Sequence, residues 1–167
     1  MLSNTNSWIV RDAIISSRGA KSCLVEHARP EHSGDSKIRF NIGSKDSPSK
    51  TPFGATTFNN EVSSQKTIEF NLTDEEVGSV QGVVEWLTDY LSQHSERIFR
   101  KTMTREQVAE SFRSPATQRG GYQPHLRCKI RPSSVRVWDS SGRAREGGLP
   151  CDLRGYNLVP RITLEKI

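Results

Sequence analysis

Basic and apolar side chains alternate in the segment 124–131. Such alternation is typical of a half-buried β-strand, in which every second side chain projects from one face, about 6.6 Å from the next. Successive nucleotides of an extended single strand are spaced on a similar scale. The basic face can therefore follow a phosphate backbone without reading base sequence. The candidate residues on this face are His125, Arg127, Lys129 and Arg131.

Two aromatic residues lie close to this predicted strand in the sequence. The segment 135–139 predicts a second strand, on which Arg136 and Trp138 share the outer face, and Tyr122 precedes the basic strand. Stacking of a base on an exposed aromatic ring contributes ~1–3 kcal/mol, so both aromatics are candidate platforms for unpaired bases. The alternative is a solvated sheet face with the tryptophan under the following loop.

A further basic group, which includes Arg100 and Lys101, follows the predicted long helix. These two cations are candidates for phosphate contacts. An equally good interpretation is structural, because positive side chains stabilise the C-terminal end of a helix.

The charge of the chain is unevenly distributed. Residues 97–167 hold 15 Lys and Arg against 6 Asp and Glu, whereas residues 1–96 hold 9 against 13, and the net charge is +5. Most of the basic residues in the second part are arginines, whose planar fork suits phosphate groups and stacks on bases. This asymmetry indicates a polyanionic partner, and a solvated surface that is merely basic is the alternative.

The sequence carries no recognisable catalytic or metal-binding pattern. It lacks a P-loop, an HExxH and a GxSxG motif, and its three cysteines form no CxxC pair. We therefore predict that the protein is not an enzyme, with no catalytic residues, no cofactor and no metal.

Composition limits the class of protein further. Only 33% of the residues are hydrophobic, and no apolar run of ~18 residues, which a membrane span requires, is present. The N-terminal residues lack a basic stretch followed by an apolar one, so no secretory signal is indicated. We expect an intracellular protein that is neither secreted nor bound to a membrane.

The elements that would position these residues follow from periodicity and capping patterns. Thr73 and Glu76 form a predicted capping box for an amphipathic helix over about 74–98, and Thr104 and Gln107 form another for a short helix to about Phe112. Strands are expected over 8–15 (with a helix as the open alternative), 21–26, 37–42, 66–72, 124–131, 135–139 and 161–167.

These elements predict a mainly β fold with helices. Short strands of this kind suit a small, partly open, five-stranded barrel with one long and one short helix. We expect residues 1–36 to form an N-terminal extension of short strands and loop, and residues 37–167 to form the nucleic-acid-binding domain.

The order of several short motifs resembles that of a known family, the single-stranded-DNA-binding proteins of short-tailed phages and large DNA viruses. The resemblance covers roughly residues 50–167. The matching positions are Pro52–Gly54, Phe58-Asn59, Ser95–Phe99, Lys101, Thr104–Val108, Tyr122–Pro124, Leu126, Lys129-Ile130, Trp138-Asp139, Gly142 and Leu158–Arg161.

The resemblance implies an oligonucleotide-binding (OB) fold that binds single-stranded DNA without sequence preference during replication, recombination or repair. It also implies a homodimer, contacts with replication proteins and a nuclear or viral replication site. The chain departs from the family pattern because no acidic tail follows Ile167, which suggests a C-terminally truncated copy.

Two other functions stay open at this point. The long polar loop 43–65, with Phe53 and Phe58, would suit a protein-interaction or assembly module. The same basic face would also suit RNA or duplex DNA.

Overall fold

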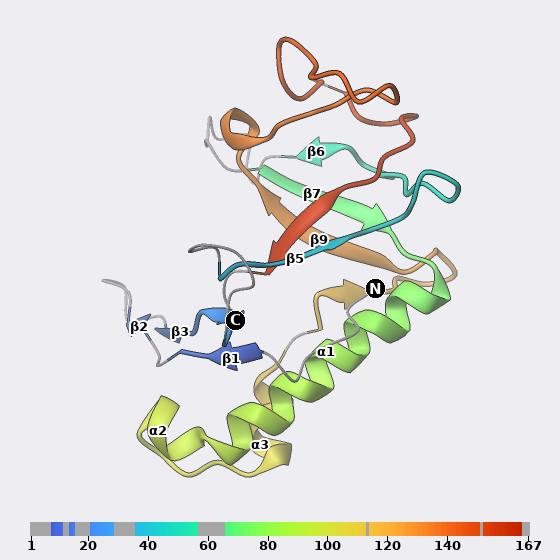
Figure 1. The fold of residues 1–167 in the computed structure, drawn as a ribbon. Coiled ribbons are helices and arrows are strands. Elements are labelled where there is room, and N and C mark those ends of the chain that lie inside the picture. Colours follow the sequence, from blue (N-terminus) through green and yellow to red (C-terminus); the bar gives the residue numbers. More distant parts are fainter. Residues whose placement is uncertain are drawn as a thin grey trace. The chain divides into compact units, whose positions relative to one another are not determined.

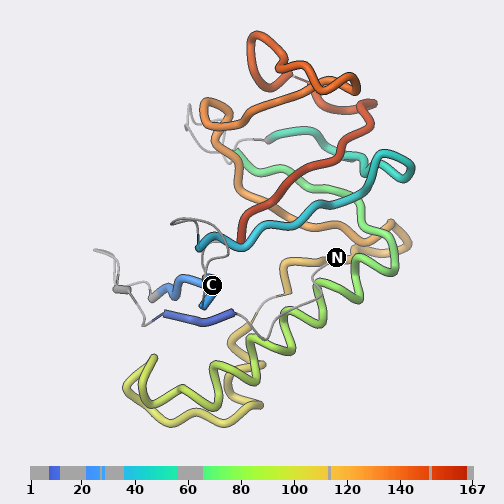
Figure 2. The backbone as a smooth tube through the Cα atoms, viewed as in Figure 1, coloured from blue at the N-terminus to red at the C-terminus, as the bar shows by residue number. Residues whose placement is uncertain are grey.

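The computed structural model describes residues 8–11, 14–15, 21–28, 36–56, 66–112, 114–150 and 152–164. The chain divides into two compact units that interleave along the sequence (Figures 1 and 2). Unit 1 comprises residues 1–41, 75–114 and 161–167, and unit 2 comprises residues 42–74 and 115–160. The expected boundary between residues 36 and 37 does not coincide with this division.

Three antiparallel strand pairs belong to unit 1. Strand β1 (Trp8–Val10) pairs with β4 (Val25–His27), and β2 (Ile14–Ile15) pairs with β3 (Lys21–Ser22). Strand β5 (Ile38–Asn41) pairs with β10 (Arg161–Leu164), which joins two segments about 120 residues apart in the sequence into one two-stranded sheet. The helix alternative for residues 8–15 is therefore wrong for the described residues of that segment.

The helices of unit 1 are α1 (Asp74–Gln93), α2 (Ser95–Phe99) and α3 (Arg105–Ser111). Helix α1 begins directly after Thr73, as predicted, but the single helix expected to residue 98 is interrupted at His94. The Oγ atom of the buried Ser95 accepts a hydrogen bond from the Met103 N–H at 3.0 Å. This bond ties the beginning of α2 to the chain that leads into α3.

The core of unit 1 lies between the buried face of α1 and the N-terminal strands. Val83, Leu87 and Leu91 on α1 belong to one buried cluster with Trp8 and Val10 of β1. The described strand β1, within the expected N-terminal extension, therefore contributes to the core.

Aromatic contacts extend this core. The rings of Trp8 and Trp86 meet edge to face at 5.5 Å, and Trp86 is 5.3 Å from Tyr90. The aromatic residues of α1 are thus packing residues and not a ligand platform.

Unit 2 is built on a four-stranded antiparallel sheet with the order β6-β7-β9-β8 (Figure 1). The strands are β6 (Ala55–Thr56), β7 (Lys66–Asn71), β8 (Ala116–Thr117) and β9 (His125–Ile130). The long loop expected over 43–65 is thus interrupted by β6, and its residues 57–65, with Phe58, lie outside the described residues.

The observed fold agrees with the predicted class only at a coarse level. It is a mixed fold with three helices and short antiparallel strands in four small sheets, and the described strands do not close into a barrel. Over the same residues, no helix combines the length and the apolar character that crossing a membrane requires.

Candidate nucleic-acid interface

The pairing of β7 with β9 determines which side chains share a face of the sheet. Lys129 pairs with Thr67, and Arg127 pairs with Glu69. Directly paired residues of antiparallel strands project from the same side, so Arg127 and Lys129 lie on one face, where both are exposed. The other face carries the buried residues Ile68, Phe70 and Leu126. The predicted separation of basic and apolar faces is confirmed for these residues.

His125 departs from that prediction because its side chain is buried, with 5% of the residue exposed. Its Nε2 atom is 2.8 Å from Thr117 Oγ1 and 3.4 Å from Glu69 Oε2. The prediction that His125 presents a cation to solvent on the basic face is therefore wrong. Partners from the two neighbouring strands enclose the ring, and the alternating pattern within one strand cannot reveal them.

The group of Thr117, His125 and Glu69 superficially suggests nucleophilic catalysis. In a catalytic triad the hydroxyl and the carboxylate bind opposite nitrogens of the imidazole, so that the base is oriented while it accepts a proton. Here both partners lie at Nε2. The arrangement is that of a polar contact in the sheet and not that of a triad.

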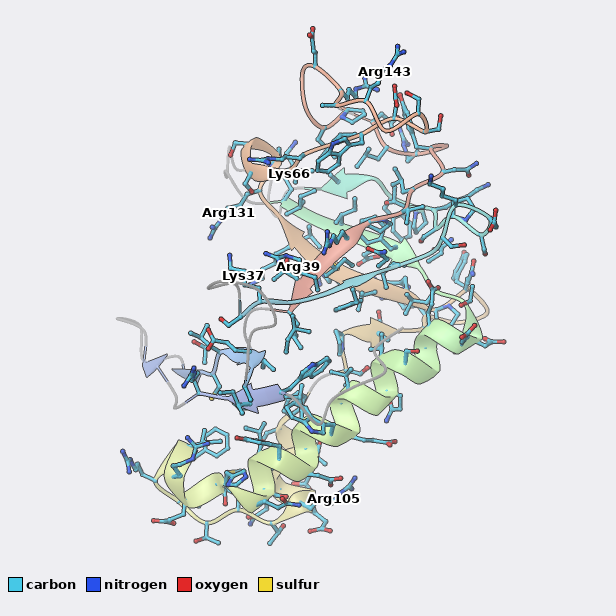
Figure 3. All side chains as sticks on the ribbon, viewed as in Figure 1. Lys37, Arg39, Lys66, Arg105, Arg131 and Arg143 are labelled. Atoms are coloured by element: carbon cyan, nitrogen blue, oxygen red, sulfur yellow. The ribbon has the colours of Figure 1, made fainter. Side chains whose placement is uncertain are left out.

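Further cations lie at the end of the β7–β9 pair where β9 finishes. Lys66 opens β7 opposite Ile130, and Arg131 follows Ile130 directly (Figure 3). Arg131 shares the face of Lys129, whereas Lys66, being paired with Ile130, projects from the opposite, apolar side of the sheet. The position of Lys66 beside this strand end depends on the register between two segments that are about 60 residues apart in the chain, which the sequence of either segment alone does not reveal.

Trp138 occupies a hairpin rather than the predicted strand. Residues 135–139 contain only an isolated bridge, between Trp138 and Ala144. The Arg145 N–H donates to the Val137 carbonyl at 2.9 Å, and the Asp139 N–H donates to the Arg143 carbonyl at 2.9 Å. We call residues 137–145 the Trp138 hairpin.

The side chain of Asp139 stabilises the tip of the Trp138 hairpin. Its Oδ1 atom accepts hydrogen bonds from the Ser141 hydroxyl at 2.6 Å, the Ser141 N–H at 2.9 Å and the Arg143 N–H at 3.0 Å. The Ser141 hydroxyl, followed by these N–H groups, lowers the pKa of Asp139 below its ordinary value. Trp138 remains 58% exposed on this ordered turn, and Arg136 before it is also exposed.

The remaining predicted residues divide between the units. Tyr122 is 78% exposed in unit 2, in the turn that leads into β9. Arg100 and Lys101 are exposed but belong to unit 1. Arg100 has a left-handed backbone (φ 57°), and its N–H donates to the Glu96 carbonyl at the end of α2. The structure thus gives Arg100 a helix-ending role in unit 1.

Exposed aromatic residues are concentrated in unit 2. Every large apolar side chain that is exposed in the described part of the chain belongs to this unit. Its segment 115–160 also holds eight Lys and Arg against three Asp and Glu. These exposed residues are Phe53, Tyr122, Trp138, Tyr156 and Val159.

The described residues contain no group of three or more His, Cys, Asp and Glu side chains that could hold a metal ion. Burial raises the pKa of the Cys128 thiol to about 12, so this thiol is protonated at neutral pH.

Comparison of the chain with protein-family models, curated proteins and solved structures finds no match.

Proposed function

We propose that the protein binds single-stranded DNA without sequence preference, through the basic face of β9 and the exposed aromatic residues of unit 2. The observation that supports this most strongly is the presence of four exposed aromatic side chains and an excess of arginine in one unit. Cations contact a phosphate backbone whatever its sequence, and aromatic rings stack on any unpaired base.

The proposed binding residues differ from those expected from sequence alone. Arg127, Lys129 and Arg131 would contact phosphates. Tyr122 and Trp138 would stack on bases, with Arg136 beside the latter. His125 is omitted because it is buried, and Arg100 and Lys101 are omitted because they belong to the other unit.

The proposal includes the biological setting that the family resemblance implies, which is DNA replication, recombination or repair. A sheet of four antiparallel strands with a basic outer face supports an OB-like arrangement for unit 2. The same proposal includes assembly as a homodimer and replication proteins as partners. It also includes a replication site in the nucleus or in infected cells.

Fluorescence anisotropy of a labelled oligo-dT across a salt series tests the proposal. If three cations each contact one phosphate, the logarithm of Kd should rise with the logarithm of salt with a slope of about 2. Replacing both Arg127 and Lys129 by alanine should weaken binding and lower this slope by about 1.4. The double variant Lys45→Ala and Lys50→Ala is the matched control, because it removes the same charge elsewhere in unit 2.

Competition with unlabelled duplex DNA and RNA distinguishes the proposed ligand from its alternatives. Single-stranded DNA should compete best, because a duplex does not offer unpaired bases to the aromatic residues. Absence of binding at low salt would overturn the proposal, and so would equal effects of the two double variants.

A further inference from the structure

A second group of exposed side chains in unit 2 lies outside the proposed β9 face. Phe53 is 62% exposed and Tyr156 is 44% exposed. They belong to two turns that meet, since a Cβ atom added to Gly54 would lie 3.7 Å from Arg154 Cγ and 3.9 Å from Leu153 N. Figure 2 shows these two stretches of chain, coloured teal and red-orange, in the same unit.

Buried residues fix the backbone of both turns. The Thr51 side chain is buried, and its hydroxyl is 3.5 Å from the Gly54 carbonyl oxygen, to which it donates. Leu153 is only 2% exposed and anchors the other turn, which closes with a hydrogen bond from the Tyr156 N–H to the Leu153 carbonyl at 3.2 Å. The aromatic rings are therefore presented on an ordered backbone, which reduces the entropy lost on binding.

Arg154 belongs to the second turn and lies close to Gly54, and its side chain is paired with Asp152. Its Nη2 atom is 2.8 Å from Asp152 Oδ2, and its Nε atom is 3.0 Å from Asp152 Oδ1. This two-point contact orients the guanidinium plane while it neutralises the charge. A group of two aromatic rings and a neutralised, flat guanidinium is suited to stacking on a base and not to binding phosphate.

The turn that contains Phe53 and Gly54 is linked to the β9 face through neighbouring strands of the sheet. Gly54 leads directly into β6, which pairs with β7, and β7 pairs with β9. Two strand spacings amount to about 10 Å, a distance that one or two nucleotides of an extended strand can span. A DNA strand that runs from the basic face across the sheet can therefore reach the turn that carries Phe53.

We propose that Phe53, Arg154 and Tyr156 form a second base-stacking site, which takes an unpaired base of a single strand already held on the β9 face. This inference rests on the proposed function and extends it, since it predicts a longer binding footprint than the β9 face alone. We call this group the Phe53 site.

A length series of dT oligonucleotides tests the Phe53 site. The double variant Phe53→Ala and Tyr156→Ala should bind short oligonucleotides as the unaltered protein does, and long ones about tenfold more weakly. Its salt slope should be unchanged, because stacking releases no counterions. Val159→Ala is the control, since Val159 has the same exposed fraction as Tyr156.

Photocrosslinking provides a second measurement that does not depend on a variant. Long oligonucleotides that carry 5-iododeoxyuridine should crosslink to Phe53 or Tyr156 in the unaltered protein, whereas short ones should crosslink only near the β9 face. If the protein binds DNA but the double variant matches it at every length, the Phe53 site is refuted while the proposed function stands. A protein partner on these aromatics would give that same result. If the unaltered protein binds no oligonucleotide, both proposals fail.

Discussion

At the scale of single residues, the alternation of side chains predicted the outward positions of Arg127 and Lys129 but failed for His125. The alternation of side chains describes a single strand, whereas the burial of a side chain depends on the residues of the neighbouring strands. Thr117 and Glu69 approach the imidazole from β8 and β7. Their proximity depends on register, which the sequence of one strand does not determine.

The reactivity of the Cys128 thiol tests whether the apolar side of β9 is buried. Because burial disfavours the thiolate and raises the pKa to about 12, we expect the native protein to alkylate very slowly at Cys128 at pH 8. Labelling with iodoacetamide, mapped by mass spectrometry of peptides, measures this rate. The denatured chain serves as the control, and it should react readily because the thiol then has an ordinary pKa near ~8.5. Rapid labelling of folded protein at this residue would contradict the described burial.

Asp152 should show a strongly depressed pKa. The Arg154 guanidinium, followed by the Arg154 N–H, lowers the pKa of the Asp152 carboxyl to about 2. A carboxylate with a lowered pKa contributes stability above its unfolded pKa of ~3.9, and this contribution is lost as the pH falls through the folded value. The pair should thus persist at pH 4 and weaken as the pH falls toward 2.

NMR titration of the Asp152 carboxyl carbon measures this value directly. In the variant Arg154→Leu the pKa should rise toward the ordinary value, though not fully, because the backbone N–H of residue 154 still donates to the carboxylate. An unchanged pKa in this variant would show that the guanidinium is not the main cause.

At the scale of elements, the helices were predicted best because their signals are local. The capping box of Thr104 and Gln107 is present, with the Gln107 N–H donating to Thr104 Oγ1 and the Thr104 N–H donating to Gln107 Oε1. The interruption at His94 was missed because it involves a contact between Ser95 and Met103, which lies outside the helical repeat. The strand predicted over 135–139 was missed for a similar reason, since its hydrogen bonds go to residues 143 and 145 within one hairpin.

The capping box of α3 should contribute measurably to the stability of unit 1. Replacing Thr104 by alanine removes the acceptor for the Gln107 N–H and should lower the free energy of unfolding by about 1 kcal/mol. Urea unfolding followed by circular dichroism provides the measurement. Ser111→Ala, at the other end of α3, should change stability little, because its hydroxyl only donates back to the Gln107 carbonyl. Equal losses in the two variants would argue against a specific role for the cap.

The Trp138 hairpin allows stacking to be distinguished from simple charge attraction. Asp139→Ala removes a negative charge, so a purely electrostatic mechanism predicts tighter binding of DNA. We expect the opposite, a loss of about three- to tenfold in affinity for oligo-dT, because the acceptor of three hydrogen bonds at the tip disappears and Trp138 loses its fixed position. Glu146→Ala carries the same charge change in the adjoining exposed segment and should leave the affinity unchanged or raise it. Tighter binding by both variants would contradict a stacking role for the hairpin.

At the scale of the whole molecule, the sequence indicated the charge asymmetry but not how the chain is divided. Composition separated residues 1–96 from 97–167, whereas each unit combines segments from both parts. Unit 1 takes strands from both ends of the chain and the helices from its middle, and unit 2 takes the two segments between them. Long-range pairings such as β5 with β10 cause this interleaving, and they have no local signature.

The division into units leads to a prediction about where DNA binds. Reversing the charge at Arg127 and Lys129 with glutamate should reduce affinity for oligo-dT by at least about a hundredfold, because two phosphate contacts become repulsive. The same reversal at Arg100 and Lys101 changes the net charge equally but alters residues of unit 1, so we expect a change of less than about threefold if only unit 2 contacts the DNA, because screening by moderate salt leaves mainly direct contacts. Anisotropy titrations of both double variants under identical conditions make the comparison, and circular dichroism checks that each is folded. Similar losses in the two variants would show that the binding surface includes unit 1 and is not confined to the sheet of unit 2.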